Sequence, residues 1–192
     1  MNYRLSFGSN RLLVSETTQL VANYLETNNW DETKSFGIEK NVVNYPSSAS
    51  VGRVVHEMCV RLKSLTQTEL NFFANADLAD RTMLCWVSVC RTYPLVGDFT
   101  ERVIREAFWA YRECLEPLDF EFFIEEEKAA HKELDEISDV YVSTMKRVLF
   151  HMLREVGILS QHNAMQGLLP SPALLSVLEH GKNDANLYLP MR

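Results

Sequence analysis

The segment STMKRVLFHMLREVGIL, residues 143–159, decides the fold of this chain, because its two faces differ sharply when it is wound at a helical period. One face is apolar and the opposite face carries positive charge. The apolar positions are Val142, Met145, Leu149, Met152, Leu153 and Val156, and the opposite positions are Arg147, His151 and Arg154. Gly157 supplies the left-handed residue that often ends a helix. The sequence therefore predicts an amphipathic helix that stops at Gly157.

Two interpretations fit this helix. Together with the apolar segment at residues 168–175, it is similar to the reading helix and trailing segment of a helix-turn-helix module. An ordinary core helix with a solvated basic side would have the same pattern, and the segment by itself favours that second interpretation.

The rest of the chain also has a helical pattern. Of the 192 residues, 46% are hydrophobic and 23% are charged, which is ordinary for a folded protein and argues against disorder. Apolar residues recur at helical spacing in nearly every segment, with no sustained strand alternation. We therefore expect an all-α protein of two packed halves, divided at Pro117. Residues 1–116 form the N-terminal half, and residues 117–192 form a C-terminal half with a helix-turn-helix-like or winged-helix-like element.

Local capping signals predict where individual helices begin. Thr66 and Glu69 have the spacing of a capping box, and Ser171 before Pro172 is a cap followed by proline at the first helical position. Serine and aspartate side chains are also favoured at the N-cap, where they accept a hydrogen bond from a free backbone amide. The other N-caps that we predict are Ser15, Asp31, Asp77 and Asp98.

No stretch approaches the roughly 20 consecutive apolar residues that a membrane span requires. The first residues, MNYRLSF, lack a charged region followed by a long apolar one, which a secretory leader would have. We expect a cytoplasmic protein without a membrane partner.

Charge is distributed unevenly along the chain. The net charge is −7, but residues 1–95 hold nine basic and nine acidic residues, residues 96–140 hold five and fourteen, and residues 141–192 hold five and three. Phosphate binding depends on the local field and not on the total charge. The neutral first half and the mildly basic end are therefore compatible with nucleic acid.

Motifs for catalysis are missing from the sequence. It contains neither a phosphate-cradling glycine loop nor a serine nucleophile elbow. The cysteines have no C-x-x-C spacing and lie in helical stretches, so we expect buried reduced thiols at Cys59, Cys85, Cys90 and Cys114. We expect no cofactor, metal or small-molecule substrate.

One arrangement could suggest a nuclease. Asp119 followed by Glu126 and Lys128 has the order of residues with which such enzymes hold magnesium and orient water. Sites of that kind are normally built on strands, whereas the aromatic residues here have helical spacing. An acidic helix face is the better interpretation.

Several blocks in order along nearly the whole chain resemble one known family. They are YLETNNWD (24–31), SSASVGR (47–53) with Arg61 and Leu62, LTQTEL (65–70), LCWVSVCRTY (84–93), DFEFF (119–123), KAAHKEL (128–134) and VLFHMLREVGIL (148–159). Each block alone is weak, but their number and order make the match fairly specific. The chain resembles the BrxA family, small proteins of bacterial BREX phage-defence systems.

The resemblance implies an all-helical protein with helix-turn-helix-like elements that binds double-stranded DNA. It also implies partners among the BREX proteins that methylate host DNA and restrict phage. The chain departs from the family pattern at His151, where we expect an arginine, and near Asp139, where we expect a basic residue. Both departures lower the positive charge of the helix.

These observations lead to a non-enzymatic, DNA-associated role with contacts mainly to phosphates. The expected DNA-binding residues are Arg53, Arg61, Lys63, Lys146, Arg147, His151 and Arg154. The alternative is a protein-protein adaptor that does not touch DNA and docks through the acidic residues Glu125 to Glu127.

Overall fold

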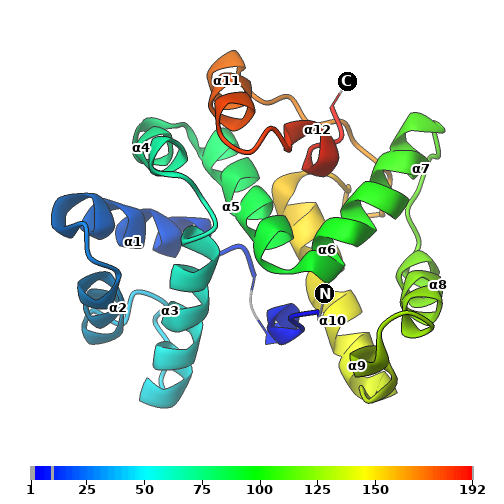
Figure 1. The fold of residues 1–192 in the computed structure, drawn as a ribbon, viewed down its shortest axis with the longest axis horizontal. Coiled ribbons are helices and arrows are strands. Elements are labelled where there is room, and N and C mark those ends of the chain that lie inside the picture. The colour runs from blue at the N-terminus through cyan, green and yellow to red at the C-terminus, as the bar shows by residue number, and fades with distance from the viewer. Residues whose placement is uncertain (1–2, 10, 192) are drawn as a thin grey trace.

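The computed structural model describes residues 3–9 and 11–191, and this part of the chain is all-α, as expected (Figure 1). A short 3-10 turn, η1 (Ser6–Ser9), is followed by α1 (Val14–Thr27), α2 (Trp30–Glu39), α3 (Ser48–Leu62), α4 (Gln67–Asn75) and α5 (Leu78–Thr92). The next helices are α6 (Pro94–Phe99), the π-helical segment η2 (Thr100–Ile104), α7 (Arg105–Trp109), α8 (Pro117–Lys128), α9 (Lys132–Asp135), α10 (Asp139–Val156), α11 (Pro172–His180) and α12 (Ala185–Tyr188).

Helix α5 is the centre of the molecule. Trp86, Val87 and Val89 on this helix are completely buried. Helices α1, α3, α4, α6, α10 and α12 all pack against it. In Figure 1, α1 to α3 lie on one side of α5, and α8 to α10 lie on the other. None of the helices in the described ranges is long and apolar enough to cross a membrane.

Several predicted caps are confirmed. Thr66 and Glu69 form both bonds of the capping box. The side chain of Asp77 accepts a bond from the Asp80 amide, and the Ser171 hydroxyl accepts one from Leu174. The capping bonds themselves join neighbours in sequence, which is why the sequence predicts them.

Three other predicted caps are wrong. Helix α1 begins at Val14, one residue before Ser15. The Asn29 side chain caps α2 by accepting bonds from the amides of Asp31 and Glu32. This places Asp31 in the first turn of the helix. Asp98 does not start a helix either, because Pro94 takes the first helical position and the chain stays helical through α6, η2 and α7.

Pro117 is the first residue of α8, but elements from both sides of it share one core. Helix α10 packs against α5 and η1, and α11 packs against α4. The division into halves at residue 117 stays a prediction.

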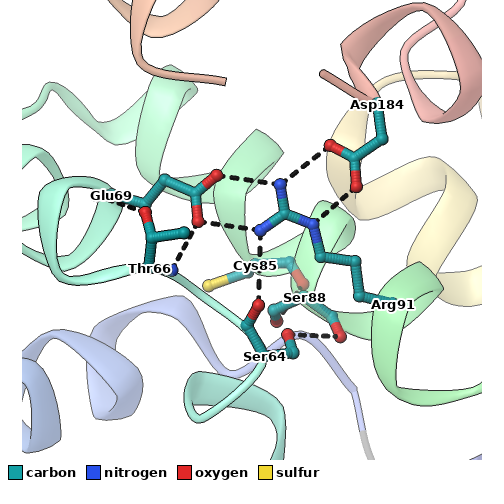
Figure 2. A network of polar contacts seen from close by, with 7 residues as sticks. All are labelled: Ser64, Thr66, Glu69, Cys85, Ser88, Arg91 and Asp184. Atoms are coloured by element: carbon teal, nitrogen blue, oxygen red, sulfur yellow. Dashed lines mark hydrogen bonds and ion pairs between the residues drawn. The ribbon is translucent and has the colours of Figure 1, made fainter. Parts of the chain in front are cut away.

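A buried ion network attaches the C-terminal segment to this core (Figure 2). The Arg91 guanidinium of α5 donates to Glu69 of α4 at 2.8 Å through both Nη atoms, and to both carboxylate oxygens of Asp184 at 2.7 and 2.8 Å. The side chains of Arg91 and Glu69 are 3% and 0% exposed. Burial lowers the pKa of Arg91, but the hydrogen bonds to Asp184 and Glu69 outweigh it, so that the pKa is raised overall. The network therefore stays charged and joins α4, α5 and the residues before α12.

Replacing Arg91 with alanine should destabilise the folded protein, because Glu69 and Asp184 would then lack their counter-charge in a region closed to water. We expect Arg91→Ala to lower the free energy of unfolding by about 3–5 kcal/mol, measured by urea denaturation. The exposed Arg53→Ala serves as a control and should change it by less than about 0.5 kcal/mol. A loss below about 1 kcal/mol for Arg91→Ala would show that the network does not hold the segment.

The cysteines differ from the expectation at one position. Cys59, Cys85 and Cys90 are buried, but Cys114 is exposed, because it lies in the loop between α7 and α8 and not on a helix. Burial raises the pKa of Cys59 to about 11 and that of Cys85 to about 12. Such thiols are protonated and unreactive at neutral pH.

A thiol-disulfide reagent should therefore modify only Cys114 rapidly in the native protein. The three buried thiols should react only after denaturation. A Cys114→Ser variant should lack the rapid phase, and a rapid phase of more than one thiol in the native protein would contradict the burial of the others.

Candidate nucleic-acid interface

The N-terminal segment, residues 3–9 with Arg11 and Leu12, runs between α3 and α10 (Figure 1). On the α10 side, the Tyr141 hydroxyl donates to the carbonyl of Leu5 at 2.7 Å, and the Leu12 amide donates to Glu155 at 3.1 Å. On the α3 side, Arg4 donates to Glu57. This segment therefore links the two helices that carry the predicted DNA-binding residues.

Glu57 is the main anchor of the segment on α3. It is only 6% exposed, and its carboxylate accepts hydrogen bonds from Arg4 at 2.9 Å, from Ser6 at 3.0 Å and from the hydroxyl of Tyr93. Burial raises the pKa of Tyr93 to about 12; the charge of Arg61 opposes this shift and Glu57 adds to it. Tyr93 thus remains a donor to the buried carboxylate.

Arg61 has a structural position. Its side chain donates to the Tyr93 hydroxyl at 3.1 Å and to the carbonyl of Arg11 at 2.7 Å. The residue is 4% exposed, so its guanidinium is not free to meet a phosphate. It holds the N-terminal segment in place instead, through its bond to the Arg11 carbonyl.

Helix α10 forms as its sequence predicts. The Ser138 hydroxyl accepts a bond from the Tyr141 amide, and Gly157 ends the helix with a φ of 87°. Met145, Leu149, Met152, Leu153 and Val156 are buried, together with Phe150. The amphipathic pattern is thus confirmed for most positions. Val142, predicted on the core face, is only half-buried, and Arg154, predicted on the opposite face, is half-buried as well.

Two predicted residues on the outer side of α10 remain available. Arg147 is exposed and makes no ion pair with any residue between 3 and 191 that the structure describes. His151 lies 3.4 Å from Glu155, the carboxylate that also pairs with Arg11 at 3.0 Å. Arg147 and His151 therefore lie one turn apart on the outer side of the helix. His151 is near Arg11 through their common neighbour Glu155, whereas Arg147 borders a hollow together with Asp139 and Ser143.

The remaining predicted residues have other surroundings. Lys146 pairs with Glu121 of α8, and Arg154 donates to the Asn163 side chain at 2.7 Å. Lys63 lies on the side of α3 that faces α2, with its Nζ 5.8 Å from the centre of the Trp30 ring. Arg53 is exposed and has no ion-pair partner among the described residues.

The structure adds two residues that sequence reasoning missed. The side chains of Arg4 and Arg11 are 40% and 60% exposed, and each pairs with one carboxylate of a flanking helix. Both lie outside any helix with an amphipathic pattern, and their partners are far away in sequence. Helical periodicity in the sequence therefore could not identify Arg4 and Arg11 as surface residues of this site.

A short hairpin follows α10. Antiparallel bridges join Leu159 to Met165 and Ala164 to Cys114, so that residues 158–166 lie between α10 and the loop after α7. The bond from Arg154 to Asn163 connects the turn of this hairpin to the last turn of α10.

The residues of the nuclease alternative have partners of their own. Asp119 accepts two hydrogen bonds from Arg112, at 2.8 and 2.7 Å, and Lys128 pairs with Glu125 on the same helix. Over the ranges that the structure describes, no three His, Cys, Asp or Glu side chains are grouped to hold a metal ion.

Comparisons of the sequence and the fold with known proteins identify the family of this chain. A BREX protein BrxA from Bacillus cereus (strain H3081.97) is 21% identical over 149 residues, which cover 78% of this chain and 74% of that protein. A crystal structure of an uncharacterized protein from Magnetospirillum magneticum has a TM-score of 0.82 at 17% identity, and the match covers 97% of this chain and 96% of the other. The latter similarity concerns the fold alone.

The model of the BrxA family matches residues 1–181 of the sequence. Because this match covers nearly the whole length, the chain belongs to the BrxA family of BREX phage-defence proteins.

Proposed function

We propose that this protein is a non-enzymatic accessory protein of a BREX system that binds duplex DNA through its phosphates. The proposed contact surface, which we call the basic strip, consists of Arg4, Arg11, Arg53, Arg147 and His151. One observation carries the proposal: the N-terminal segment joins α3 to α10, so that Arg4 and Arg11 lie between the helices that hold Arg53 and Arg147.

The charges of the strip favour a polyanion despite the net charge of −7. Its four arginines outnumber the two carboxylates that pair with them, Glu57 and Glu155. Glu57 is buried, which removes it from contact with a ligand. The positive charge that a duplex would meet comes mainly from Arg53 and Arg147, which have no ion-pair partner among the described residues.

The arrangement around α10 supports the interpretation of this region as winged-helix-like. Helices α8, α9 and α10 are followed by the hairpin at residues 158–166, which pairs with the strand-like residue Cys114. In helix-turn-helix proteins the second helix of the motif enters the major groove. Arg147 and His151 would then contact phosphates beside the groove. Because phosphate contacts position a protein without reading sequence, we expect binding that is weak and largely independent of sequence.

A titration with fluorescently labelled duplex at two salt concentrations tests the proposal. Neutralising four phosphates gives a slope of about −3.6 in log K against log salt, so affinity should fall about 150-fold between about 50 mM and about 200 mM salt. The double variant Arg53→Ala/Arg147→Ala should reduce the slope by about 2. Lys182→Ala, an exposed lysine beyond α11, is the matched control and should leave it unchanged.

The adaptor alternative predicts a different outcome. If no duplex binds even at the lowest salt concentration, the protein acts through other BREX proteins alone. A slope that the double variant does not alter would place the contacts elsewhere on the surface.

A further inference from the structure

One carboxylate beside the basic strip has two basic neighbours. Glu155 of α10 accepts the Leu12 amide through its Oε2 atom at 3.1 Å. Its Oε1 atom lies 3.0 Å from Nε of Arg11 and 3.4 Å from Nε2 of His151. A guanidinium and an imidazole from two distant segments of the chain therefore approach the same oxygen atom.

The net charge at this oxygen depends on the imidazole. While His151 is neutral, the charges of Arg11 and Glu155 cancel each other, whereas a proton on His151 leaves one positive charge in excess. Glu155 lies in the last turn of α10, where the helix end is partly negative and a carboxylate needs a cationic partner. A protonated His151 supplies that partner from within the same helix, because the two residues are four positions apart.

All three side chains are in contact with water. The side chains of Arg11, His151 and Glu155 are 60%, 41% and 24% exposed. A proton from the solvent can therefore reach His151 without unfolding, and imidazole is the side chain whose charge ordinarily changes between about pH 5 and about pH 8. Exposed ion pairs are weak, so Arg11 can leave Glu155 at little cost once the carboxylate has another cation.

The charged groups that face His151 come from α10, the N-terminal segment and the start of α1. They are Arg147, Arg154, Glu155, Arg11 and Glu16. Other elements also pack against α10, but η1 consists of uncharged residues, and α5 contributes the uncharged Leu78 and Thr82 to the hollow beside Glu155. Glu121 of α8 pairs with Lys146 on the other flank of α10. Glu155 is thus the group within ion-pair distance of the imidazole.

We propose that protonation of His151 transfers Glu155 from Arg11 to His151 and thereby strengthens the binding of duplex DNA at lower pH. The proposal rests on the proposed function, since the released Arg11 acts on a phosphate. Glu155 is then an inhibitory carboxylate, which occupies one guanidinium of the basic strip for as long as His151 is neutral. Release of Arg11 adds about one phosphate contact.

Titrations with labelled duplex at about pH 5.5 and about pH 8, each over a range of salt concentrations, test the effect on binding. One additional phosphate contact steepens the slope of log K against log salt by about 0.9. With equal affinities at about 1 M salt, binding at the lower pH should be about 15-fold tighter at about 50 mM salt and about fourfold tighter at about 200 mM.

Two substitutions of His151 fix its charge in opposite ways. His151→Gln cannot gain a proton and should bind weakly at both pH values, whereas His151→Lys is positive throughout and should bind tightly at both. His180→Gln is the matched control, because His180 is an exposed histidine on α11, and it should retain the pH dependence of the wild type. Persistence of this dependence in His151→Gln would overturn the proposal. The same holds if it is lost in His56→Gln, which changes an exposed histidine near Arg53 on α3.

NMR spectra of the protein without DNA test the exchange of partners separately. We expect the Nε–Hε resonance of Arg11 to shift with the same pH midpoint as the Cε1–Hε1 resonance of His151, and to stay constant in His151→Gln. An Arg11 resonance that does not follow the titration of His151 would overturn the proposal. If it does follow but no duplex binds at any pH, the exchange of partners stands, and the proposed function fails together with the gain in affinity.

Discussion

The buried carboxylate of Glu57 is the constraint on which the proposed interface depends. A carboxylate closed to water must be compensated by donors, and here Arg4, Ser6 and Tyr93 provide them. Two of these donors belong to the N-terminal segment, so satisfying Glu57 fixes the segment on α3. The segment in turn reaches α10 through Leu5 and Leu12. One buried charge thus determines how two helices far apart in sequence present their arginines.

Helix α10 makes different ion pairs on its two flanks. On one flank Glu155 pairs with Arg11 and lies close to His151. On the other flank Lys146 pairs with Glu121 of α8. Both flanks come from the same amphipathic sequence, and the difference arises from the neighbours: the N-terminal segment on one side and α8 on the other.

The sequence predicted what depends on neighbours along the chain. The all-α class, the limits of α10 and the capping box at Thr66 follow from helical periodicity and local hydrogen bonds. Burial of particular charges could not be predicted in this way. Arg61 was expected at the surface because its side chain is charged, but Tyr93 and the carbonyl of Arg11 enclose it once the chain has folded. The start of α6 was also predicted wrongly. Asp98 is a residue type that often caps a helix, but the helix already begins at Pro94, four residues earlier.

The attachment of the N-terminal segment also has a consequence for the motion of the two helices beside it. Its side chains and backbone are bonded to Glu57 on α3 and to Tyr141 and Glu155 on α10. The two helices therefore cannot move apart unless these bonds break first, so residues that precede the first long helix of the chain act as a brace between helices from opposite ends of the sequence.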